Sequence, residues 1–337
     1  LDGRPALVVT TRPADKLSLF GEKLLRLFLL DDPDRSRTGA TPLLAVGGGL
    51  CLAASVPPWG WWPLAFVGVA IWDRLLASTP ARGRFLRSWL LGVAWLAPAM
   101  LWMYDFTAPG YPIAVAVFGT YVGVAGLLVP GGSDRSWVRW LAVPGAFTLA
   151  EAARWTFPFG GVPVATTAMS QAAAPLGQVA RVGCAIGVVF VVGIVGVALS
   201  AAWERNWRVA AGALTGVVVV FAVAMVAPNG HVVGSVEVAL VQGGGRQGTR
   251  AEHTDPREVF ERHLVASERI VPPVDLVLWP ENVVDVEGTV GSTREGRELS
   301  ALAEDLDTTL VVGVTEGLDA ESFVNASIVY LPDGSQG

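Results

Sequence analysis

The chain has 337 residues, of which 52% are hydrophobic and only 16% are charged, and its formal net charge is −6. Because a soluble domain needs more charge than this to cover its surface, the composition favours a membrane protein. The acidic balance excludes the basic footprint of a nucleic-acid-binding protein, so no nucleic-acid partner is expected.

Residues 1–40 are predicted to form a cytoplasmic N-terminal segment. Its apolar stretch, residues 17–30, is interrupted by Glu22, Lys23 and Arg26. Such a pattern is typical of an amphipathic helix that lies on a membrane surface, and it is too polar for a span.

Residues 41–234 are predicted to form a bundle of about seven transmembrane helices. A helix needs about 20 mostly apolar residues to cross a bilayer, with about 17–25 as the working range. The candidate stretches fit or approach this length, and they cover residues 41–56, 61–77, 85–104, 111–129, 138–155, 183–203 and 209–227.

The arginines predict the orientation of this bundle. They fall in alternate connections, whereas the connections around residues 57–60, 105–110 and 157–178 contain no lysine or arginine. The positive-inside rule therefore places the N-terminus in the cytoplasm, and an odd number of spans places the residues after 227 on the extracytoplasmic face. The arginines that carry this inference are Arg74, Arg82, Arg84, Arg87, Arg135, Arg139, Arg205 and Arg208.

Two charged residues, Glu151 and Arg154, lie one helical turn apart near the outer end of the fifth predicted span. Charges at this depth are costly unless they are paired or reach an interface. Two interpretations stay open: a pair at the lipid boundary, or the polar wall of a cavity that faces lipid headgroups. The following residues, 157–178, are too broken to span and too apolar for an ordinary loop, so they are predicted to lie on the outer membrane surface.

The two cysteines, Cys51 and Cys184, lie inside apolar stretches. Their positions are typical of small buried hydrophobic residues, and their spacing fits no metal cluster. The sequence therefore predicts neither a metal site nor a cofactor.

Residues 235–337 are predicted to form a water-soluble α/β domain. Strands are expected at 236–242, 275–279, 310–314 and 326–331, with helices at 256–270 and 293–306. This alternation predicts a mainly parallel sheet with helices on it, in which reactive groups gather beyond the carboxyl ends of the strands. Glu281 follows the second strand, in the sequence Trp279-Pro280-Glu281. By itself it could also be a solvated carboxylate in a turn.

Short motifs of this region resemble the opening half of a nitrilase-type (carbon–nitrogen hydrolase) domain. They are Val241-Gln242-Gly243, Leu278-Trp279-Pro280-Glu281-Asn282, Val312-Gly313 and Asn325-Ala326-Ser327. Behind seven predicted spans, they look like the bacterial apolipoprotein N-acyltransferase family. Residues 58–63 and 147–155, with the turn at Phe159-Gly160, fit the membrane part of that family. The resemblance covers residues 39–337.

The resemblance implies an acyltransferase of the bacterial cell membrane whose nitrilase-like domain lies on the extracytoplasmic face. Members of the family use a Glu-Lys-Cys triad. The cysteine takes an acyl chain from a phospholipid as a thioester, and the α-amino group of a diacylglyceryl-cysteine at a lipoprotein N-terminus accepts it. Glu281 is then the expected general base. The expected substrate-binding residues are Glu151, Arg154, Trp155, Phe159, Gln247 and Asn325.

The sequence departs from this pattern in its triad, and the segment after Gln242 lacks the tryptophan often found there. Its last lysine is Lys23, and both cysteines precede residue 235, so Glu281 is the one triad member that it supplies. We expect the rest of the nitrilase-like domain to follow Gly337 and the chain alone to be inactive. The alternative is a catalytically inactive membrane scaffold that anchors a partner such as a polyprenol-phosphate mannose synthase. The excess of arginine over lysine suits an actinobacterial source. A transporter is disfavoured because the sequence shows no inverted repeat.

Overall fold

The computed structural model describes residues 40–337 except 132–136, 159, 229, 246–253 and 319–321. The predicted N-terminal amphipathic helix lies outside these residues. The chain divides into two compact units, Leu1–Pro228 and Asn229–Gly337, which are described separately below.

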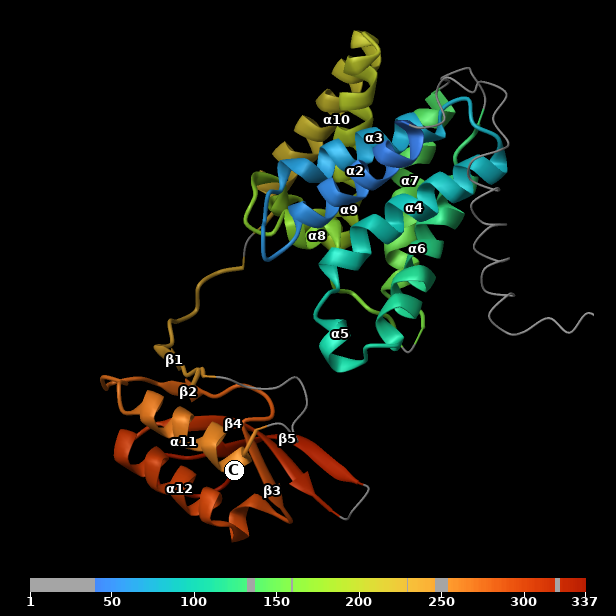
Figure 1. Cartoon of the computed structure of the whole chain (residues 1–337). Helices are drawn as coiled ribbons and strands as arrows, with labels where there is room; N and C mark the ends of the chain where they lie inside the picture. Colours follow the sequence, from blue (N-terminus) through green and yellow to red (C-terminus); the bar gives the residue numbers. More distant parts are fainter. Residues whose placement is uncertain (1–39, 132–136, 159, 229, 246–253, 319–321) are drawn as a thin grey trace, which may run out of the picture. The chain divides into compact units, whose positions relative to one another are not determined.

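The described part of the first unit is a bundle of helices (Figure 1). Its long helices coincide with the seven apolar stretches of the sequence, and short helices interrupt the connections. The elements are α2 (Ala40–Ser55), α3 (Pro63–Leu76), α4 (Ala81–Ala99), α5 (Met103–Phe106), α6 (Gly110–Leu128), α7 (Trp137–Arg154), α8 (Thr167–Ser170), the 3₁₀ helix η1 (Pro175–Val179), α9 (Ala180–Trp203) and α10 (Trp207–Val226).

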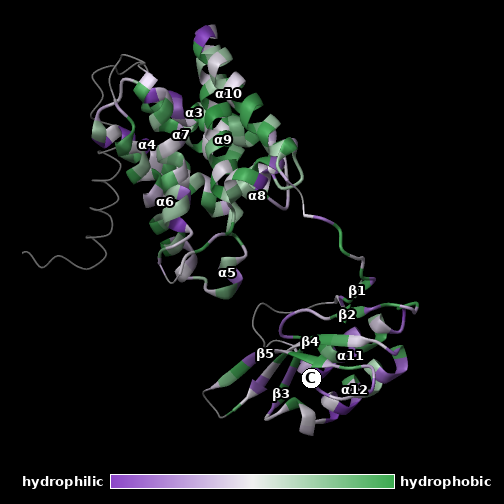
Figure 2. Cartoon of the chain, turned by 180° about the vertical axis from the view of Figure 1, so that it is seen from behind, coloured by the Kyte–Doolittle hydropathy of each residue, from purple (hydrophilic) through white to green (hydrophobic). Residues whose placement is uncertain are grey.

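Three helical stretches of the described residues are long and apolar enough to cross a membrane. They are Gly110–Leu128, Pro175–Trp203 and Trp207–Val226, and α2 is apolar but shorter. Figure 2 shows that hydrophobic residues predominate along α9 and α10. The seven helices are therefore confirmed as helices, while a count of seven spans stays a prediction.

The helices pack around a core that large aromatic side chains fill. Helix α4 lies between α2 and α6, and α9 lies against α3, α7 and α10. The Phe147 ring lies 5.9 Å from the Trp95 ring and 5.7 Å from the Trp72 ring, measured between centroids. Trp72 and Trp95 are almost fully buried. Aromatic contacts of this kind join α3, α4 and α7.

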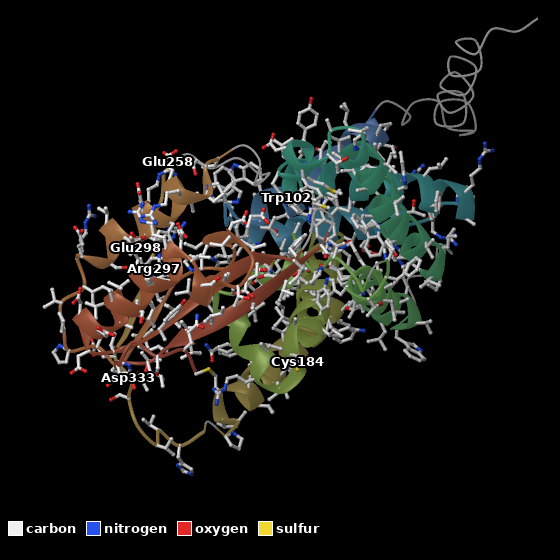
Figure 3. All side chains as sticks on the ribbon, turned by 90° about the horizontal axis from the view of Figure 1, so that it is seen from below. Trp102, Cys184, Glu258, Arg297, Glu298 and Asp333 are labelled. Atoms are coloured by element: carbon white, nitrogen blue, oxygen red, sulfur yellow. The ribbon has the colours of Figure 1, made fainter. Side chains whose placement is uncertain are left out.

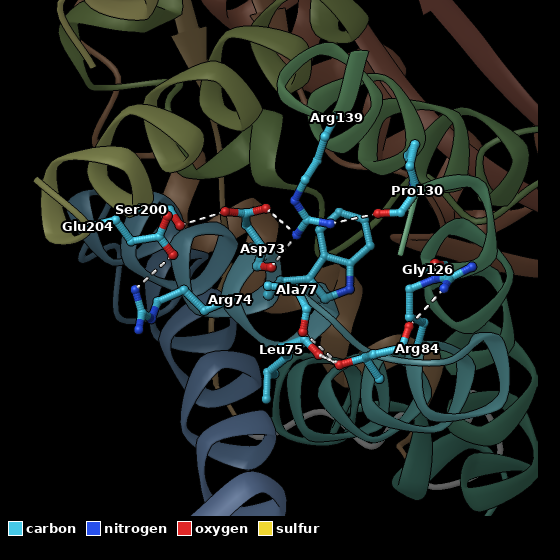
Figure 4. Close-up of polar contacts among 12 residues, drawn as sticks. Asp73, Arg74, Leu75, Ala77, Arg84, Gly126, Pro130, Arg139, Ser200 and Glu204 are labelled. Carbon is cyan, nitrogen blue, oxygen red and sulfur yellow. Dashed lines mark hydrogen bonds and ion pairs between the residues drawn. The ribbon is translucent and has the colours of Figure 1, made fainter. Parts of the chain in front are cut away.

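One end of the bundle contains a layer of buried polar contacts (Figure 4). Arg139 of α7 pairs with Asp73 of α3, and Ser200 of α9 donates a hydrogen bond to the same carboxylate. Arg84 of α4 donates to the carbonyl oxygen of Gly126 in α6. These contacts bring together the helix ends that carry most of the arginines. The cytoplasmic location of this end stays a prediction.

Helix α9 departs from helical geometry at Cys184, where φ is 51°. The Cys184 side chain is exposed, and Cys51 is half-buried. The expectation that both cysteines are buried is therefore wrong for Cys184, because the break lies in the first turns of α9, outside the core of the bundle (Figure 3).

The second unit is a five-stranded sheet with helices. Its elements are β1 (Val238–Leu240), α11 (Pro256–Ser267), β2 (Leu276–Leu278), β3 (Val284–Glu287), the 3₁₀ helix η3 (Val290–Ser292), α12 (Arg294–Leu306), β4 (Thr309–Gly317) and β5 (Phe323–Tyr330). Strands β1, β2 and β4 are parallel neighbours, β3 is parallel to β4, and β5 is antiparallel to β4. The mainly parallel sheet is confirmed, and β3 is a strand that the sequence did not predict.

Helices α11 and α12 cover one face of this sheet (Figure 1). Phe260 of α11 and Leu299 of α12 join the buried side chains of Val277 and Val312 in one core. The opposite face holds exposed apolar side chains, among them Leu240 and Phe323. The described residues thus form one helix-covered sheet, and the second layer of a nitrilase-like sandwich stays a prediction.

Candidate active site

Glu281 lies in a turn that leaves the edge of β4. Both β2 and β3 pair with β4, with Leu278 opposite Val311 and Val284 opposite Val314. Residues 279–283 therefore oppose only residues 312–313 of β4, and the surplus chain bulges out with Glu281 at its exposed tip. The turn follows the carboxyl end of β2, where open α/β sheets place their ligands.

Backbone contacts fix the two ends of this turn. The Trp279 N–H donates to the Val311 carbonyl oxygen at 2.9 Å, and the Val283 N–H donates to that of Gly313 at 3.2 Å. A Cβ atom on Gly313 would lie 2.5 Å from the Cα atom of Glu281. Only glycine at position 313 lets the turn lie this close to β4.

Two side-chain hydrogen bonds orient the turn. Asn325 of β5 donates from Nδ2 to Oε1 of Glu281 at 2.6 Å. Thr315 of β4 donates from Oγ1 to Oδ1 of Asn282 at 3.0 Å, and Asn282 adopts a φ of 58°. Thr315 and Asn325 are register partners in the sheet. Neighbouring positions on two strands therefore hold two successive residues of one turn.

The resulting arrangement suits proton transfer. The Glu281 carboxylate is exposed, one of its oxygens accepts a hydrogen bond, and the pairing of three strands fixes its backbone. A positioned carboxylate that substrate can reach is what a general base requires. The structure brings Glu281 and Asn325 together, whereas their roles stay predictions.

A second carboxylate, Asp285, lies close to this turn on β3. It is the register partner of Thr315. Partial burial, and then the nearby negative charge of Glu287, raise the pKa of the Asp285 carboxyl above its usual value. Asp285, Asn282, Thr315 and Gly313 were not predicted as site residues. Gly313 was part of a motif of the resemblance, but no role was predicted for it. The sequence alone does not reveal that the turn packs against this position.

Glu151 and Arg154 form a buried ion pair in the first unit. Oε2 of Glu151 lies 2.7 Å from Nη2 of Arg154, and both side chains are 2% exposed. Oε1 of Glu151 accepts hydrogen bonds from the backbone N–H of Thr167 at 2.9 Å and from its hydroxyl at 2.6 Å. Nη1 of Arg154 donates to the carbonyl oxygens of Val162 and Val164.

The pair therefore fastens residues 162–167 to the end of α7. This segment has no long helix or strand to satisfy its backbone groups, so the two charged side chains do so instead. The structure thus shows a structural use for the pair, and substrate binding by Glu151 and Arg154 stays a prediction.

Trp155, the next residue along, lines a cavity of about 340 Å³ beside the start of α9. The cavity wall comes from the segment after α7 and from the first turns of α9, and apolar side chains predominate in it. The other lining residues are Pro163, Thr166, Ala168, Met169, Ala172, Gly177, Ala180, Ala185 and Val188.

Two of the predicted substrate-binding residues, Phe159 and Gln247, lie outside the described residues. Among the described residues, no three or more histidine, cysteine, aspartate or glutamate side chains gather as metal ligands would. The candidate sites are therefore the Glu281 turn in the second unit and the apolar cavity in the first.

Comparisons with known proteins find similarity in both units of the chain. The family model for the apolipoprotein N-acyltransferase N-terminal domain matches residues 48–198. Apolipoprotein N-acyltransferase of Mycolicibacterium smegmatis is 29% identical over 80% of this chain and 50% of its own length. The enzymes of that name from Caulobacter vibrioides and Pseudomonas aeruginosa are 29% and 26% identical, over 74% and 81% of this chain and 51% and 57% of their own lengths.

The chain spans about half the length of the curated relatives that it matches. A match over 80% of 337 residues is longer than the first unit, which ends at Pro228, so the similarity reaches into the second unit. The family model and the relatives thus show that this chain is similar to apolipoprotein N-acyltransferases.

Proposed function

We propose that this chain is part of an enzyme that N-acylates the N-terminal diacylglyceryl-cysteine of bacterial lipoproteins, with Glu281 as the general base. The observation that carries the proposal is the hydrogen bond from Asn325 to the exposed Glu281 carboxylate, in a turn at the carboxyl end of β2. The similarity to apolipoprotein N-acyltransferases supports the reaction class.

The proposed reaction needs an exposed carboxylate that is held in place. Ionised Glu281 takes the proton of a cysteine thiol, and the thiolate attacks the ester carbonyl carbon of a phospholipid. The C–O bond of the ester breaks, the lysophospholipid leaves with the proton, and the acyl chain stays on sulfur as a thioester. The α-amino group of the lipoprotein then attacks the thioester, an amide forms, and the thiol recovers its proton. The cysteine that supplies this thiol is implied by the resemblance to the family triad, and it is neither Cys51 nor Cys184.

The membrane setting fits such substrates. A phospholipid and a lipidated protein both reside in the bilayer, and three helical stretches among the described residues are long and apolar enough to cross it. We place the protein in the bacterial cell membrane with its second unit on the extracytoplasmic face, an orientation that the arginine distribution supports.

Glu281→Gln in the intact protein tests the proposal. The amide keeps the size of the side chain and cannot accept the thiol proton, so the acyl-thioester should not form when phospholipid is added. Intact-mass measurement after incubation with phospholipid detects the added acyl group. Glu268→Gln, which changes an exposed carboxylate at the end of α11, is the matched control and should form the thioester normally.

Normal thioester accumulation in the Glu281→Gln variant would exclude the proposed role. Recovery of both variants from the membrane fraction in equal amounts would separate this result from a failure of folding or insertion. For the scaffold alternative, with a polyprenol-phosphate mannose synthase as its partner, the described residues offer no supporting observation.

A further inference from the structure

The Glu281 turn lies on the face of the sheet that the helices leave open. Side chains of a strand alternate between the two faces, and Val312 and Val314 of β4 point into the core that the sheet shares with α11 and α12. Gly313 therefore faces the other way, and a Cβ atom added to it would meet the Cα atom of Glu281 at 2.5 Å. Thr315, two residues farther along β4, faces the same way as Gly313.

Three polar residues form a row across this open face. Asp285 of β3, Thr315 of β4 and Asn325 of β5 are register partners, so their side chains leave the same face at neighbouring positions. Thr315 donates a hydrogen bond to Asn282, and Asn325 donates one to Glu281. Two members of the row therefore hold the turn. The third member, Asp285, brings an exposed carboxylate to the same place.

The surroundings of Asp285 are negatively charged. Partial burial, and then the charge of Glu287 two residues farther along β3, raise the pKa of the Asp285 carboxyl. The arginines that the structure describes in the second unit belong to α11 and α12, which cover the opposite face, or directly follow α11 (Figure 1). They are Arg257, Arg262, Arg269, Arg294 and Arg297. A carboxylate in such surroundings attracts a cation and repels a phosphate group.

The two substrates of the proposed reaction differ in charge. A phospholipid carries a phosphate group, whereas the acceptor carries an α-amino group, whose usual pKa of about 7.7–8.0 leaves it mainly protonated at neutral pH. The acceptor is therefore the substrate that suits Asp285. Because an ammonium ion has no lone pair with which to attack a thioester, it must also lose a proton.

We propose that Asp285 binds the α-ammonium group of the lipoprotein acceptor and takes one proton from it, a role that rests on the proposed function. The neutral amine then attacks the carbonyl carbon of the thioester. The C–N bond forms, the C–S bond breaks, and the departing sulfur takes a second proton from the nitrogen. The Asp285 carboxyl returns its proton to water. A raised pKa makes this carboxylate a better proton acceptor than an ordinary aspartate.

Peptide binding without turnover tests the contact with the ammonium group. The intact Glu281→Gln protein in detergent, without phospholipid, is titrated with a fluorescent peptide that begins with diacylglyceryl-cysteine, with its α-amino group either free or acetylated. Adding Asp285→Asn should weaken binding of the free-amino peptide about tenfold, through the loss of one charged contact. The acetylated peptide has no charge there and should bind both proteins equally. Equal weakening for both peptides, or none for either, would overturn the proposal.

Asp305→Asn is the matched control for this comparison. It also removes one negative charge, and Asp305 is an exposed aspartate of α12, on the opposite side of the sheet. It should leave both affinities unchanged. If Asp305→Asn weakened the free-amino peptide as much as Asp285→Asn does, the effect would come from net charge, and the assignment of Asp285 would be wrong.

The two steps of the reaction separate the role of Asp285 from that of Glu281. In the intact protein, Asp285→Asn should form the thioester from phospholipid at the normal rate and transfer the acyl group to the free-amino peptide about 10- to 100-fold more slowly. Asp285→Glu, which keeps a carboxylate, should recover part of the transfer rate. Hydroxylamine is mainly uncharged at neutral pH and should cleave the thioester equally fast in the unaltered protein and in Asp285→Asn. Slower thioester formation in Asp285→Asn would exclude its assignment to the second step.

Failure of the proposed function would appear differently, as normal thioester formation in Glu281→Gln. The peptide-binding comparison needs no thioester, so it decides on the role of Asp285 in either case.

Discussion

Arg139 and Asp73, which are 66 residues apart, form an ion pair inside the helical bundle with Nη2 of Arg139 2.8 Å from Oδ1 of Asp73 (Figure 4). The same guanidinium donates to the Asp73 and Pro130 carbonyl oxygens, and Ser200 donates to the other carboxylate oxygen at 2.5 Å. Both charged side chains are at most 1% exposed. The pair thereby joins α3 and α7, and the hydrogen bond from Ser200 adds α9.

Removing one member of this pair should destabilise the bundle strongly. In Arg139→Leu, the buried Asp73 carboxylate loses this ion pair, which costs about 3–5 kcal/mol. Thermal unfolding in detergent measures the effect, with the loss of the monodisperse size-exclusion peak after heating as the readout. The double variant Asp73→Leu with Arg139→Leu should be less destabilised than the sum of the single variants, because it leaves neither charge buried.

Arg74→Gln provides the control for this prediction. Arg74 neighbours Asp73 in the sequence, and its ion pair with Glu204, at 3.3 Å, is exposed to solvent. Exposed pairs contribute about 0–1 kcal/mol, so this variant should unfold close to the unaltered protein. Equal effects of Arg139→Leu and Arg74→Gln would show that the buried pair has no special role in stability.

Gly313→Ala should displace the Glu281 turn. The added Cβ atom would lie 2.5 Å from the Cα atom of Glu281 and equally close to the Pro280 carbonyl oxygen, so backbone must move. Crowding of this kind costs about 1–3 kcal/mol. We expect a loss of thioester formation and weaker hydrogen-exchange protection of β2 and β4.

Gly317→Ala changes a glycine of the same strand and is the control for Gly313→Ala. There the added Cβ atom meets the end of the flexible Glu287 side chain, which can rotate away. The expected effect is therefore much smaller. Unchanged exchange protection and thioester formation in Gly313→Ala would mean that the turn does not depend on the space above Gly313.

The helices of the first unit were predictable because a bilayer-length apolar stretch has few alternatives to a helix. The pairing of Arg139 with Asp73 was not, because it depends on which helices become neighbours after packing. Arg139 was assigned to a cytoplasmic connection by its charge alone, whereas in the structure it is buried at the start of α7. The exposure of Cys184 was missed for a related reason, since hydropathy does not reveal a break in a helix.

In the second unit, the strands of the core were predictable from their apolar runs, and β3 was not. Its sequence Val-Asp-Val-Glu alternates apolar and charged residues, but it is only four residues long, too short for a clear strand signal. It pairs with β4 only after the Glu281 turn returns to the edge. Glu281 could be singled out from its place after a strand. Its contact with Asn325 arises from the antiparallel register of β5 on β4, which the residue pattern alone does not determine.

Asn325→Leu tests whether the contact with Glu281 matters for activity. The substitution keeps the approximate volume and removes the donor, so the carboxylate loses a hydrogen bond of the kind that contributes about 1.5–3 kcal/mol. If the bond orients Glu281 for proton transfer, the rate of thioester formation should fall about 10- to 100-fold while membrane insertion stays normal. Asn325→Gln, which keeps a donor on a longer side chain, should recover part of the rate. An unchanged rate in Asn325→Leu would leave Asn325 without a role in the reaction.

The last prediction concerns Glu298 of α12, which is labelled in Figure 3. Its side chain links α12 to α11. Its carboxylate oxygens lie 2.5 Å and 3.0 Å from the guanidinium nitrogens of Arg257 in α11, and Arg294 also donates to it. The hydrogen bonds from Arg257, and then those from Arg294, lower the pKa of the Glu298 carboxyl below its usual value.

A carboxyl whose pKa is lower in the folded protein than in the unfolded chain stabilises the fold above the unfolded value. For a partly exposed pair that contribution is about 1 kcal/mol. It is complete above the usual pKa of a glutamate, near 4.3, and is lost as the pH falls from there through the lowered pKa of the folded protein. Exchange protection of α11 and α12 should therefore decrease between pH 5 and pH 3 by more in the unaltered protein than in Glu298→Gln. Asp285, whose pKa is raised, acts in the opposite direction in both proteins and cancels from the comparison. Asp305→Asn changes an exposed carboxylate of the same helix and is the control, which should keep the full pH dependence. If Glu298→Gln showed the same pH dependence as the unaltered protein, the Arg257 contact would add nothing to stability.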